Sequence, residues 1–425
     1  MTQPRPRAAV VVTGSELVRG ERSDRNGPFL AAEAVRLGLD PERITIVGDR
    51  PEDLERALAD GFGAALCLVS GGLGPTHDDR TVEMVALVAG RTLIVDAGLE
   101  QEIEGVSRMV AERMGRPYTE FATGVTKQAT LPEGAISLGL AGTAPGFVLD
   151  TDGSAVIVVL PGPPTELRRL WPRALETPPV QRVLERAPAR GRAVLRFYGT
   201  PESAVARALA EAGGDGDGVE ATICAREFEI HVDLVYDPDA RERADALAAA
   251  LRGGLERYLF SEDGRSVAEI VLERCRARGL TLAAAESCTG GLVAARLTGV
   301  RGSSDVFRGG VVAYANDVKE SYLGVSRELL ERHGAVSAKV VQAMAHGVRE
   351  RLGADVGVAV TGIAGPDGGT EEKPVGLVLI HAVGPEAEKA RHIELPGDRD
   401  IVRSRATVAA LHLVRKLLEN RHTAE

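Results

Sequence analysis

Residues 65–79 read ALCLVSGGLGPTHDD, a short apolar run that passes directly into a glycine-rich turn. An apolar run of this length, bounded by glycine, is typical of a buried strand. The same order recurs nearby, where AAVVV (8–12) and ITIV (44–47) each lead through a turn into a helix-like segment. Alternating strands and helices predict a parallel sheet with helices on both faces. We therefore expect residues 1–172 to form a three-layer α/β domain.

The pattern changes twice along the rest of the chain. Residues 173–260 contain the strand-like VLRFYG (194–199), the segment EATICAREFEIHVDLVY (220–236) as one long strand or a hairpin, and two helix-like runs. This predicts a small α+β connector. Residues 261–425 again alternate strand-like and helix-like runs, and end in a long helix that begins near Arg399. The last part is therefore predicted to be a second α/β domain.

Composition narrows the class of protein. The 425 residues are 44% hydrophobic and 26% charged, which is typical of globular chains. The formal net charge of −10 argues against nucleic-acid or membrane-surface partners, because both need a cationic face. No apolar run reaches the roughly 20 residues that span a bilayer. The four cysteines are scattered without a CxxC pair, so we expect a cytoplasmic protein without disulfides or structural zinc. Separately, we expect the protein to form a homodimer.

The turn after the 66–70 strand is a candidate phosphate site. Gly71, Gly72 and Gly74 allow the backbone to approach a phosphate, and Thr76 adds a hydroxyl. Asp78 and Asp79 follow directly, either as caps of the next helix or as ligands of a divalent metal ion shared with substrate phosphates. Glu16, on the turn after the first strand, could reach the same edge of the sheet.

A second candidate site begins at AESCTGG (285–291), where a strand-like run enters a helix. Such a turn can place the Ser287 hydroxyl beside backbone N–H groups, as an acyl-transfer nucleophile requires. Alternatively, Ser287 or Thr289 caps the helix. Cys288 is a rival nucleophile, because a thiol attacks more readily than a hydroxyl once its pKa is lowered.

A serine nucleophile needs a base, and none of these motifs contains a histidine. Tyr314 and Lys319 lie in the next motif, YANDVK. A buried, neutral Lys can accept the proton, with Tyr as a relay or support, whereas Arg stays charged. Only 6 of the 51 basic residues are Lys, which makes Lys319 notable, although it could be an ordinary surface residue.

Two further segments could bind an anionic substrate. VTGIAGPDGG (360–369) offers the Thr361 hydroxyl and the backbone around Gly362, as Gly290 and Gly291 offer theirs in the earlier turn. GDRDIVRSR (397–405) places Arg399, Arg403 and Arg405 at a helix start, where one guanidinium could bind phosphate and the others would be solvated.

The motifs GSELVRG, SGGLGPTHDDRT, KQATLPEGA and LPGPPTEL of the first domain resemble the CinA (competence/damage-inducible) family. The resemblance implies a molybdopterin-binding-like fold and a metal-dependent ADP-ribose pyrophosphatase activity. In that case Gly71, Gly72, Gly74 and Thr76 would bind phosphate, and Asp78, Asp79 and Glu16 would bind a metal ion of unspecified identity. The connector resembles the KH-like insert of the same family.

The motifs AESCTGG, GSSDVFRGGVVAYANDVK, VTGIAGPDGGTEEKPVG and GDRDIVRSRA resemble the family's C-terminal domain, which deamidates nicotinamide mononucleotide (NMN). The resemblance implies hydrolysis to nicotinate mononucleotide and ammonia without a cofactor. Ser287 matches the nucleophile, Lys319 and Tyr314 its basic partners, Thr361 a substrate-site residue, and Arg403, in preference to Arg399, the phosphate contact. Two alternatives are that the first domain only binds a nucleotide or pterin and regulates the second, and that the chain is an accessory protein of DNA uptake.

Overall fold

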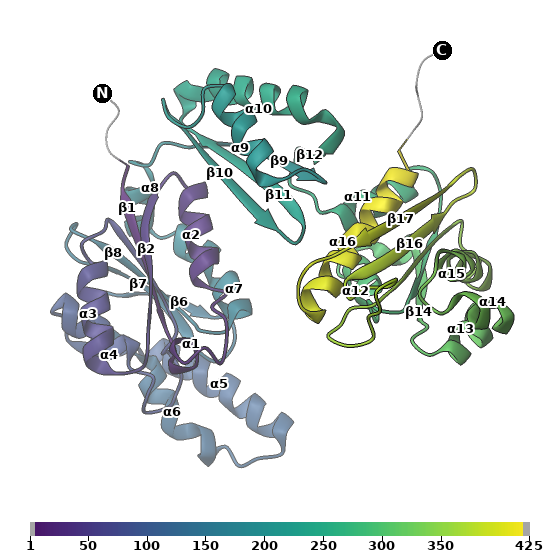
Figure 1. The fold of residues 1–425 in the computed structure, drawn as a ribbon. Coiled ribbons are helices and arrows are strands. Elements are labelled where there is room, and N and C mark those ends of the chain that lie inside the picture. Colours follow the sequence, from purple (N-terminus) through teal and green to yellow (C-terminus); the bar gives the residue numbers. More distant parts are fainter. Residues whose placement is uncertain (1–4, 420–425) are drawn as a thin grey trace. The chain divides into compact units, whose positions relative to one another are not determined.

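The computed structural model describes residues 5–419 (Figure 1). The chain divides into two compact units, one ending at Gly191 and the other beginning at Arg192. Residues 173–191, which were predicted to belong to the connector, thus lie in the first unit. The rest of the predicted connector and the predicted C-terminal domain together lie in the second unit. Among the described residues, no helix has the length and apolar character needed to cross a membrane.

The first unit is built on a six-stranded sheet with the order β2-β1-β3-β8-β7-β6. Its strands are β1 (Arg7–Thr13), β2 (Asp40–Val47), β3 (Leu66–Ser70), β6 (Ile136–Leu140), β7 (Pro145–Asp150) and β8 (Val156–Leu160). The first four strands in this order pair in parallel, as predicted, but β7 and β6 pair antiparallel. The reason is that residues 141–144 are too few for the crossover that a parallel pair needs.

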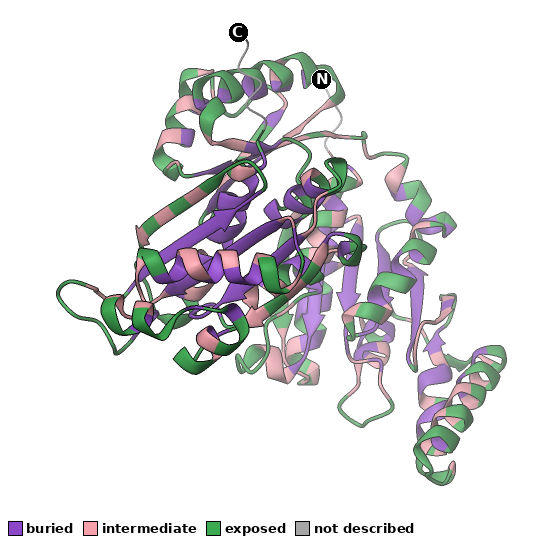
Figure 2. Ribbon diagram, turned by 90° about the vertical axis from the view of Figure 1, so that its right-hand side faces the viewer, coloured by how far each residue is buried: buried purple, intermediate pink, exposed green. Residues whose placement is uncertain are grey.

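Helices cover both faces of this sheet, so the three-layer α/β prediction is confirmed (Figure 2). Val11 and Val69 point into one core and Val10 and Leu68 into the other, because successive strand side chains alternate between faces. The helices are α1 (Ser15–Val18), α2 (Gly27–Arg36), α3 (Pro51–Gly61), α4 (Thr81–Ala89), α5 (Ala97–Met114), α6 (Thr119–Ala129), α7 (Pro164–Leu175) and α8 (Pro178–Leu184). The short strands β4 (Leu93–Val95) and β5 (Thr130–Pro132) form a separate pair.

The second unit begins with the connector, a four-stranded sheet of order β10-β11-β9-β12 packed against two helices. Its elements are β9 (Gly191–Tyr198), α9 (Glu202–Glu211), β10 (Val219–Arg226), β11 (Glu229–Tyr236), η1 (Pro238–Ala240), α10 (Arg241–Leu255), η2 (Glu256–Tyr258) and β12 (Leu259–Ser261). Of the two predicted forms for residues 220–236, the structure has the hairpin. Glu227 and Phe228 make its turn with positive φ angles of 51° and 74°.

The rest of the second unit is a five-stranded sheet of order β14-β13-β15-β16-β17. Its strands are β13 (Leu282–Glu286), β14 (Phe307–Val312), β15 (Val356–Gly362), β16 (Leu377–Val383) and β17 (Glu388–Glu394), and the first three in the sheet order are parallel. The helices are α11 (Val267–Ala277), α12 (Leu292–Thr298), η3 (Ser303–Asp305), α13 (Asn316–Leu323), α14 (Arg327–His333), α15 (Ala338–Arg351) and α16 (Arg399–Leu417). Helix α16 is buried along most of its length after Arg405.

A buried histidine joins the connector to this second sheet. The ring of His412 on α16 stacks on Tyr198 of β9 with a centroid separation of 3.7 Å. The Nε2 atom of His412 lies 2.7 Å from a carboxylate oxygen of Glu229 on β11. The connector therefore packs on α16 through a polar and aromatic contact.

Candidate active site

Ser287 stands at the carboxyl edge of three adjacent parallel strands. It directly follows β13, and its N–H donates to the carbonyl oxygen of Val360 on β15 at 2.9 Å. On the other side, the N–H of Ala313 donates to the carbonyl oxygen of Glu286 at 2.8 Å. The topology therefore brings Ser287, Tyr314 and Thr361 to one edge of the sheet, where α/β proteins commonly bind their ligands.

Glu286, and neither Ser287 nor Thr289, caps helix α12. Its buried carboxylate accepts hydrogen bonds from the N–H groups of Gly291, Val293 and Ala294 at 2.8–3.0 Å. Within the described part of the chain, the Ser287 hydroxyl forms no hydrogen bond and the Thr289 hydroxyl is buried without a partner. Sequence reasoning missed Glu286, because a capping acid normally stands next to the first helical turn.

Lys319 is a core residue. Its side chain on α13 is only 1% exposed, which excludes the surface alternative. The amine donates to the carbonyl oxygen of Tyr314 at 3.0 Å. Burial lowers the pKa of Lys319, and only the thiolate form of the nearby Cys288 would oppose this shift. Lys319 thus loses its proton more easily than a solvated lysine does, and the neutral amine is the form that a general base requires.

The Tyr314 phenol is bonded to Arg399 and not to Lys319. The side chain is 62% exposed, and its hydroxyl accepts a hydrogen bond from Arg399 at 3.1 Å. Tyr314 and Lys319 are therefore joined through the backbone carbonyl. Cys288 is buried, and burial raises the pKa of its thiol to about 12. The thiol is therefore protonated near neutral pH and is a weak nucleophile.

The arginines at the start of α16 hold the surrounding loops. Arg403 donates to the carbonyl oxygens of Cys288 and Thr289, both at 3.1 Å. Arg399 donates to the carbonyl oxygen of Gly365 at 2.9 Å. Arg405 donates to the carbonyl oxygen of Pro396 at 2.7 Å. Arg403 thus lies against the turn that follows Ser287, and Arg399 lies against Tyr314 and the loop after β15.

Three glycines and one threonine line the same edge. Gly290 has a φ of 60°, and a Cβ there would lie 3.3 Å from the Arg403 guanidinium. Gly291 has a φ of 98°. A Cβ at Gly362 would lie 2.6 Å from the carbonyl oxygen of Leu377, so the strand pairing itself requires glycine. Thr361 is 1% exposed and donates its hydroxyl to the carbonyl oxygen of Ala335.

In the first unit, the loop between β3 and α4 is folded around its own side chains. Gly71 and Gly72 have φ angles of 105° and 65°, and the Thr81 hydroxyl donates to the carbonyl oxygen of Gly71 at 2.8 Å. Asp79 accepts hydrogen bonds from the N–H and the hydroxyl of Thr76. A cavity of about 140 Å³ adjoins Gly72, Gly74 and Asp79. Lys127 also lines it and donates to the carbonyl oxygen of Thr76.

The acidic residues of this loop do not form a metal cage. Arg80, not an aspartate, is the N-cap residue of α4, and Asp78 is exposed. Glu16, Asp78 and Asp79 do not converge: among the described residues, the group of three potential ligands within 4.8 Å of one another is His346, His381 and Glu388. The three predicted acids therefore do not fit a shared metal ion in this arrangement.

Comparison with known proteins identifies the family. A "CinA-like protein" of Mycolicibacterium paratuberculosis is 45% identical over 97% of this chain and 98% of its own length. The chain belongs to the CinA-like protein family. The CinA-like protein of Mycobacterium tuberculosis is 43% identical over 97% of each chain.

Two family models match separate parts of this CinA-like chain. Residues 9–181 match the "Probable molybdopterin binding domain", and residues 264–418 match the "CinA C-terminal domain". A crystal structure of the competence/damage inducible protein CihA from Agrobacterium tumefaciens is 38% identical, covering 38% of this chain and all of its own, with a TM-score of 0.36. The full-length relatives and the two family models confirm the resemblance to the CinA family and the molybdopterin-binding-like fold of the first domain.

Proposed function

We propose that the C-terminal domain of this CinA-like protein is an amidohydrolase that converts NMN to nicotinate mononucleotide and ammonia. The observation that carries the proposal is the buried amine of Lys319, whose pKa is lowered and which bonds the Tyr314 carbonyl at the sheet edge where Ser287 also lies. Within residues 5–419, the turn after β13 leaves the Ser287 hydroxyl without a hydrogen bond. A buried base and an unengaged hydroxyl are the two groups that serine acyl transfer requires.

In the proposed reaction, the Ser287 oxygen attacks the carboxamide carbon of NMN while Lys319 takes the hydroxyl proton. Collapse of the tetrahedral intermediate breaks the carbon–nitrogen bond, and Lys319 returns the proton to the leaving ammonia. Water then attacks the acyl ester, again losing a proton to Lys319, which passes it to the Ser287 oxygen. Nicotinate mononucleotide leaves, and the enzyme returns to its starting state.

The backbone amides of Cys288 and Thr289 are the candidates to stabilise the negative oxygen, and both also lie against the Cys288 sulfur. The N–H groups of Ser287, Gly290 and Gly291 are already bonded within the protein. In the described part of the chain, those of Cys288 and Thr289 have no backbone or side-chain oxygen acceptor. Loss of one such donor typically costs about 100- to 1000-fold in rate. Arg399 and Arg403 supply positive charge for the substrate phosphate at the same edge.

The test is ammonia and nicotinate mononucleotide release from NMN by the full chain, comparing Ser287→Ala with Cys288→Ala. We expect Ser287→Ala to abolish turnover. Cys288→Ala removes the adjacent rival nucleophile and serves as the matched control, which should keep most of the activity. Retained activity in Ser287→Ala with loss in Cys288→Ala would overturn the assignment, and no NMN turnover in the unaltered chain would overturn the function.

For the first domain, we propose binding of a phosphate-bearing nucleotide at the loop of residues 71–79. The support is the glycine-rich backbone and the Lys127 amine beside the adjoining cavity. ADP-ribose hydrolysis is the activity that the family resemblance suggests, and non-catalytic binding is the alternative. AMP release from ADP-ribose by the full chain, with and without chelator, separates the two. We derive no metal-dependent step, because Asp79 is bonded to Thr76 and the acids do not converge.

A further inference from the structure

The second unit contains a cavity that lies away from the candidate active site of the same unit. It has a volume of about 550 Å³, which is within the usual range for a small-molecule site. The connector contributes Tyr198, Arg257 and Tyr258 to its wall, and the opposite wall comes from β17 and α16 with Lys389, Arg391 and Lys416. Arg403 and Lys416 stand 13 residues apart on α16, so at 1.5 Å per residue they are about 20 Å apart along the helix axis.

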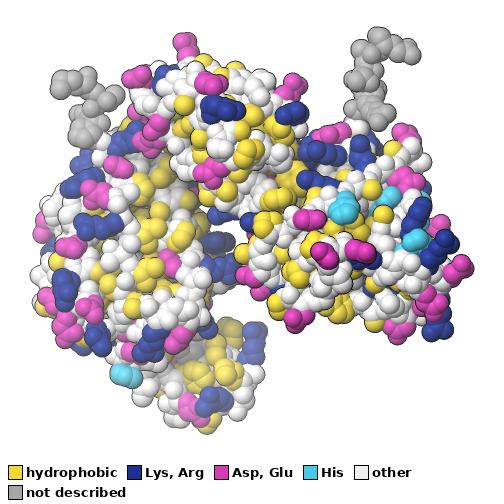
Figure 3. All heavy atoms as spheres, in the orientation of Figure 1, with side chains coloured by type: hydrophobic (Ala, Val, Ile, Leu, Met, Phe, Trp, Pro, Cys, Tyr) yellow, Lys and Arg dark blue, Asp and Glu magenta, His cyan; other side chains and the backbone are white. Residues whose placement is uncertain are grey.

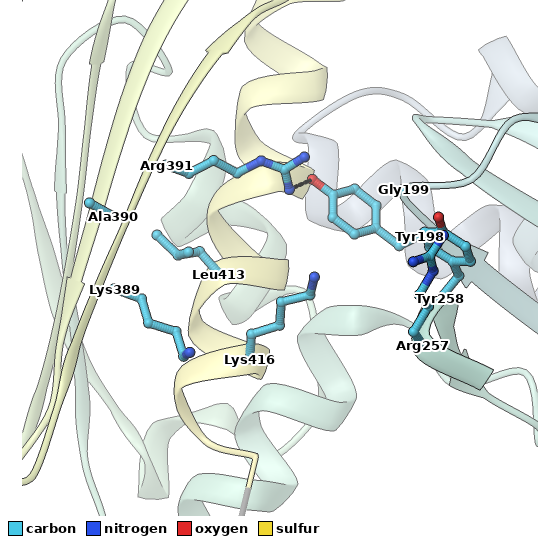
Figure 4. A pocket seen from close by; sticks show the side chains of 9 residues that line it. All are labelled: Tyr198, Gly199, Arg257, Tyr258, Lys389, Ala390, Arg391, Leu413 and Lys416. Atoms are coloured by element: carbon cyan, nitrogen blue, oxygen red, sulfur yellow. Dashed lines mark hydrogen bonds between the residues drawn. The ribbon is translucent and has the colours of Figure 1, made fainter. Parts of the chain in front are cut away.

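Among residues 5–419, the cavity wall carries four cations, Arg257, Lys389, Arg391 and Lys416, and no carboxylate. Arg391 comes from β17 and donates to the Tyr198 hydroxyl at 2.6 Å, while the guanidinium of Arg257 lies 4.5 Å from the centroid of the Tyr258 ring (Figure 4). In Figure 4 the Lys416 amine points into the space between Arg391 and Arg257. Neither contact pairs a cation of this wall with a carboxylate.

Nearby carboxylates are engaged elsewhere. Glu388, next to Lys389 in the chain, pairs with His346 and His381, and Glu419 pairs with Arg274 and Arg415. Within residues 5–419, none of the four cavity cations forms an ion pair with a carboxylate. Dark blue side chains also gather near the end of α16 in Figure 3.

The positive charge of this cavity wall contrasts with the negative net charge of the whole chain. The protein has a net charge of −10 and only six lysines, of which two line this cavity. Like charges held close together repel one another, and the repulsion is strongest where water is partly excluded. Burial together with the charges of Arg415, Arg391 and Lys389 lowers the pKa of Lys416, and the charge of Glu419 opposes this shift only in part. A bound polyanion would relieve this repulsion.

We propose that this cavity is a second ligand site, which binds an anion carrying two or more phosphate groups. Arginine forks bind phosphate oxygens through paired hydrogen bonds, and lysine amines add point charges along a phosphate chain. Four cations on three separate elements, η2, β17 and α16, suit a linear oligophosphate better than a single phosphate. Free inorganic triphosphate and the triphosphate of a nucleotide share this chemistry.

The experiment is calorimetric titration of the full chain at low ionic strength with inorganic triphosphate, ATP and orthophosphate. We expect saturable triphosphate binding that is at least about tenfold tighter than orthophosphate binding and weakens with salt. Equal affinities for triphosphate and ATP support recognition of the phosphates alone, and a higher affinity for ATP supports an added contact with the nucleoside.

Variants assign the binding to this cavity rather than to the other candidate phosphate sites. The double variant Lys389→Ala with Lys416→Ala should weaken triphosphate binding at least about tenfold. The control is Lys339→Ala, which removes an exposed lysine on α15 that does not line the cavity. This variant should leave the affinity for triphosphate unchanged. Arg257→Ala, at an exposed position, is a second test if the double variant does not fold. Absence of triphosphate binding to the unaltered chain, or unchanged affinity in a folded cavity variant, overturns the proposal.

Discussion

The buried amine of Lys319 donates a hydrogen bond to the carbonyl oxygen of Tyr314, and the two atoms are 3.0 Å apart. The contact holds the amine at the carboxyl edge of the sheet, where the strand before Ser287 also ends. The Tyr314 hydroxyl is not part of this contact and accepts a hydrogen bond from Arg399 instead. Under the proposed function, Lys319 carries the proton transfer and the Tyr314 backbone positions it.

Replacing Lys319 with Met should remove NMN hydrolysis without unfolding the protein. A general base contributes typically about 100- to 10,000-fold, so turnover should fall at least about 100-fold. Met has a similar length and avoids the desolvation of a buried amine, so the unfolding temperature should hold or rise. Lys339→Met, at an exposed position, is the matched control. Turnover of Lys319→Met within about tenfold of the original chain would exclude Lys319 as the base.

NMN hydrolysis should fall as the solution becomes more acidic. Burial lowers the pKa of Lys319, so its neutral form is present at lower pH than for a solvated lysine, and protonation below that pKa removes the base. The profile of kcat/KM against pH should therefore rise toward the alkaline side. Lys319→Arg should be inactive across this range, because the guanidinium keeps its proton. A flat profile in the original chain would contradict the role.

Glu286→Ala should destabilise the second unit. The substitution leaves three backbone N–H groups at the start of α12 without their acceptor, and an unsatisfied buried donor costs about 1–3 kcal/mol. We expect the free energy of unfolding to fall by at least about 2 kcal/mol in denaturant titrations. Glu328→Ala, an exposed acid in the first turn of α14, is the comparison and should have little effect. Equal stabilities of the two variants would disprove the capping role.

The contact between the connector and α16 should weaken in mild acid. Burial lowers the pKa of His412 from 6.5 to about 4, so the unfolded chain binds a proton that the folded chain resists. Stability from this residue is complete above about pH 6.5, declines as the pH falls below that value and levels off below about 4. The difference corresponds to at most about 3 kcal/mol.

Calorimetric unfolding of the full chain at pH 7 and pH 5.5 tests this linkage. The unfolding temperature of the original chain should drop more between these conditions than that of His412→Gln, which has no titrating ring. Equal drops in both proteins would show that other groups cause the acid sensitivity.

Local patterns predicted the α/β class, because apolar runs and glycine turns are encoded by neighbouring residues. The parallel order of β1, β2, β3 and β8 followed from strand and helix alternation, whereas the antiparallel β6 and β7 did not, since a four-residue connection gives no periodic signal. The scarcity of lysine pointed to Lys319, and its burial agrees with a special role. The chemistry assigned to Ser287, Lys319 and Tyr314 stays a prediction.

The sequence by itself determined that strands end in glycine-rich turns beside a serine, a lysine and several arginines. Only the tertiary structure decided that Glu286 caps α12 and that Asp79 bonds to Thr76. It also placed Arg257 and Lys416, 159 residues apart in the chain, in the wall of one cavity. The physical reason is that hydrophobic periodicity records which face of an element is buried, whereas the partner across that face is set by the packing of distant segments.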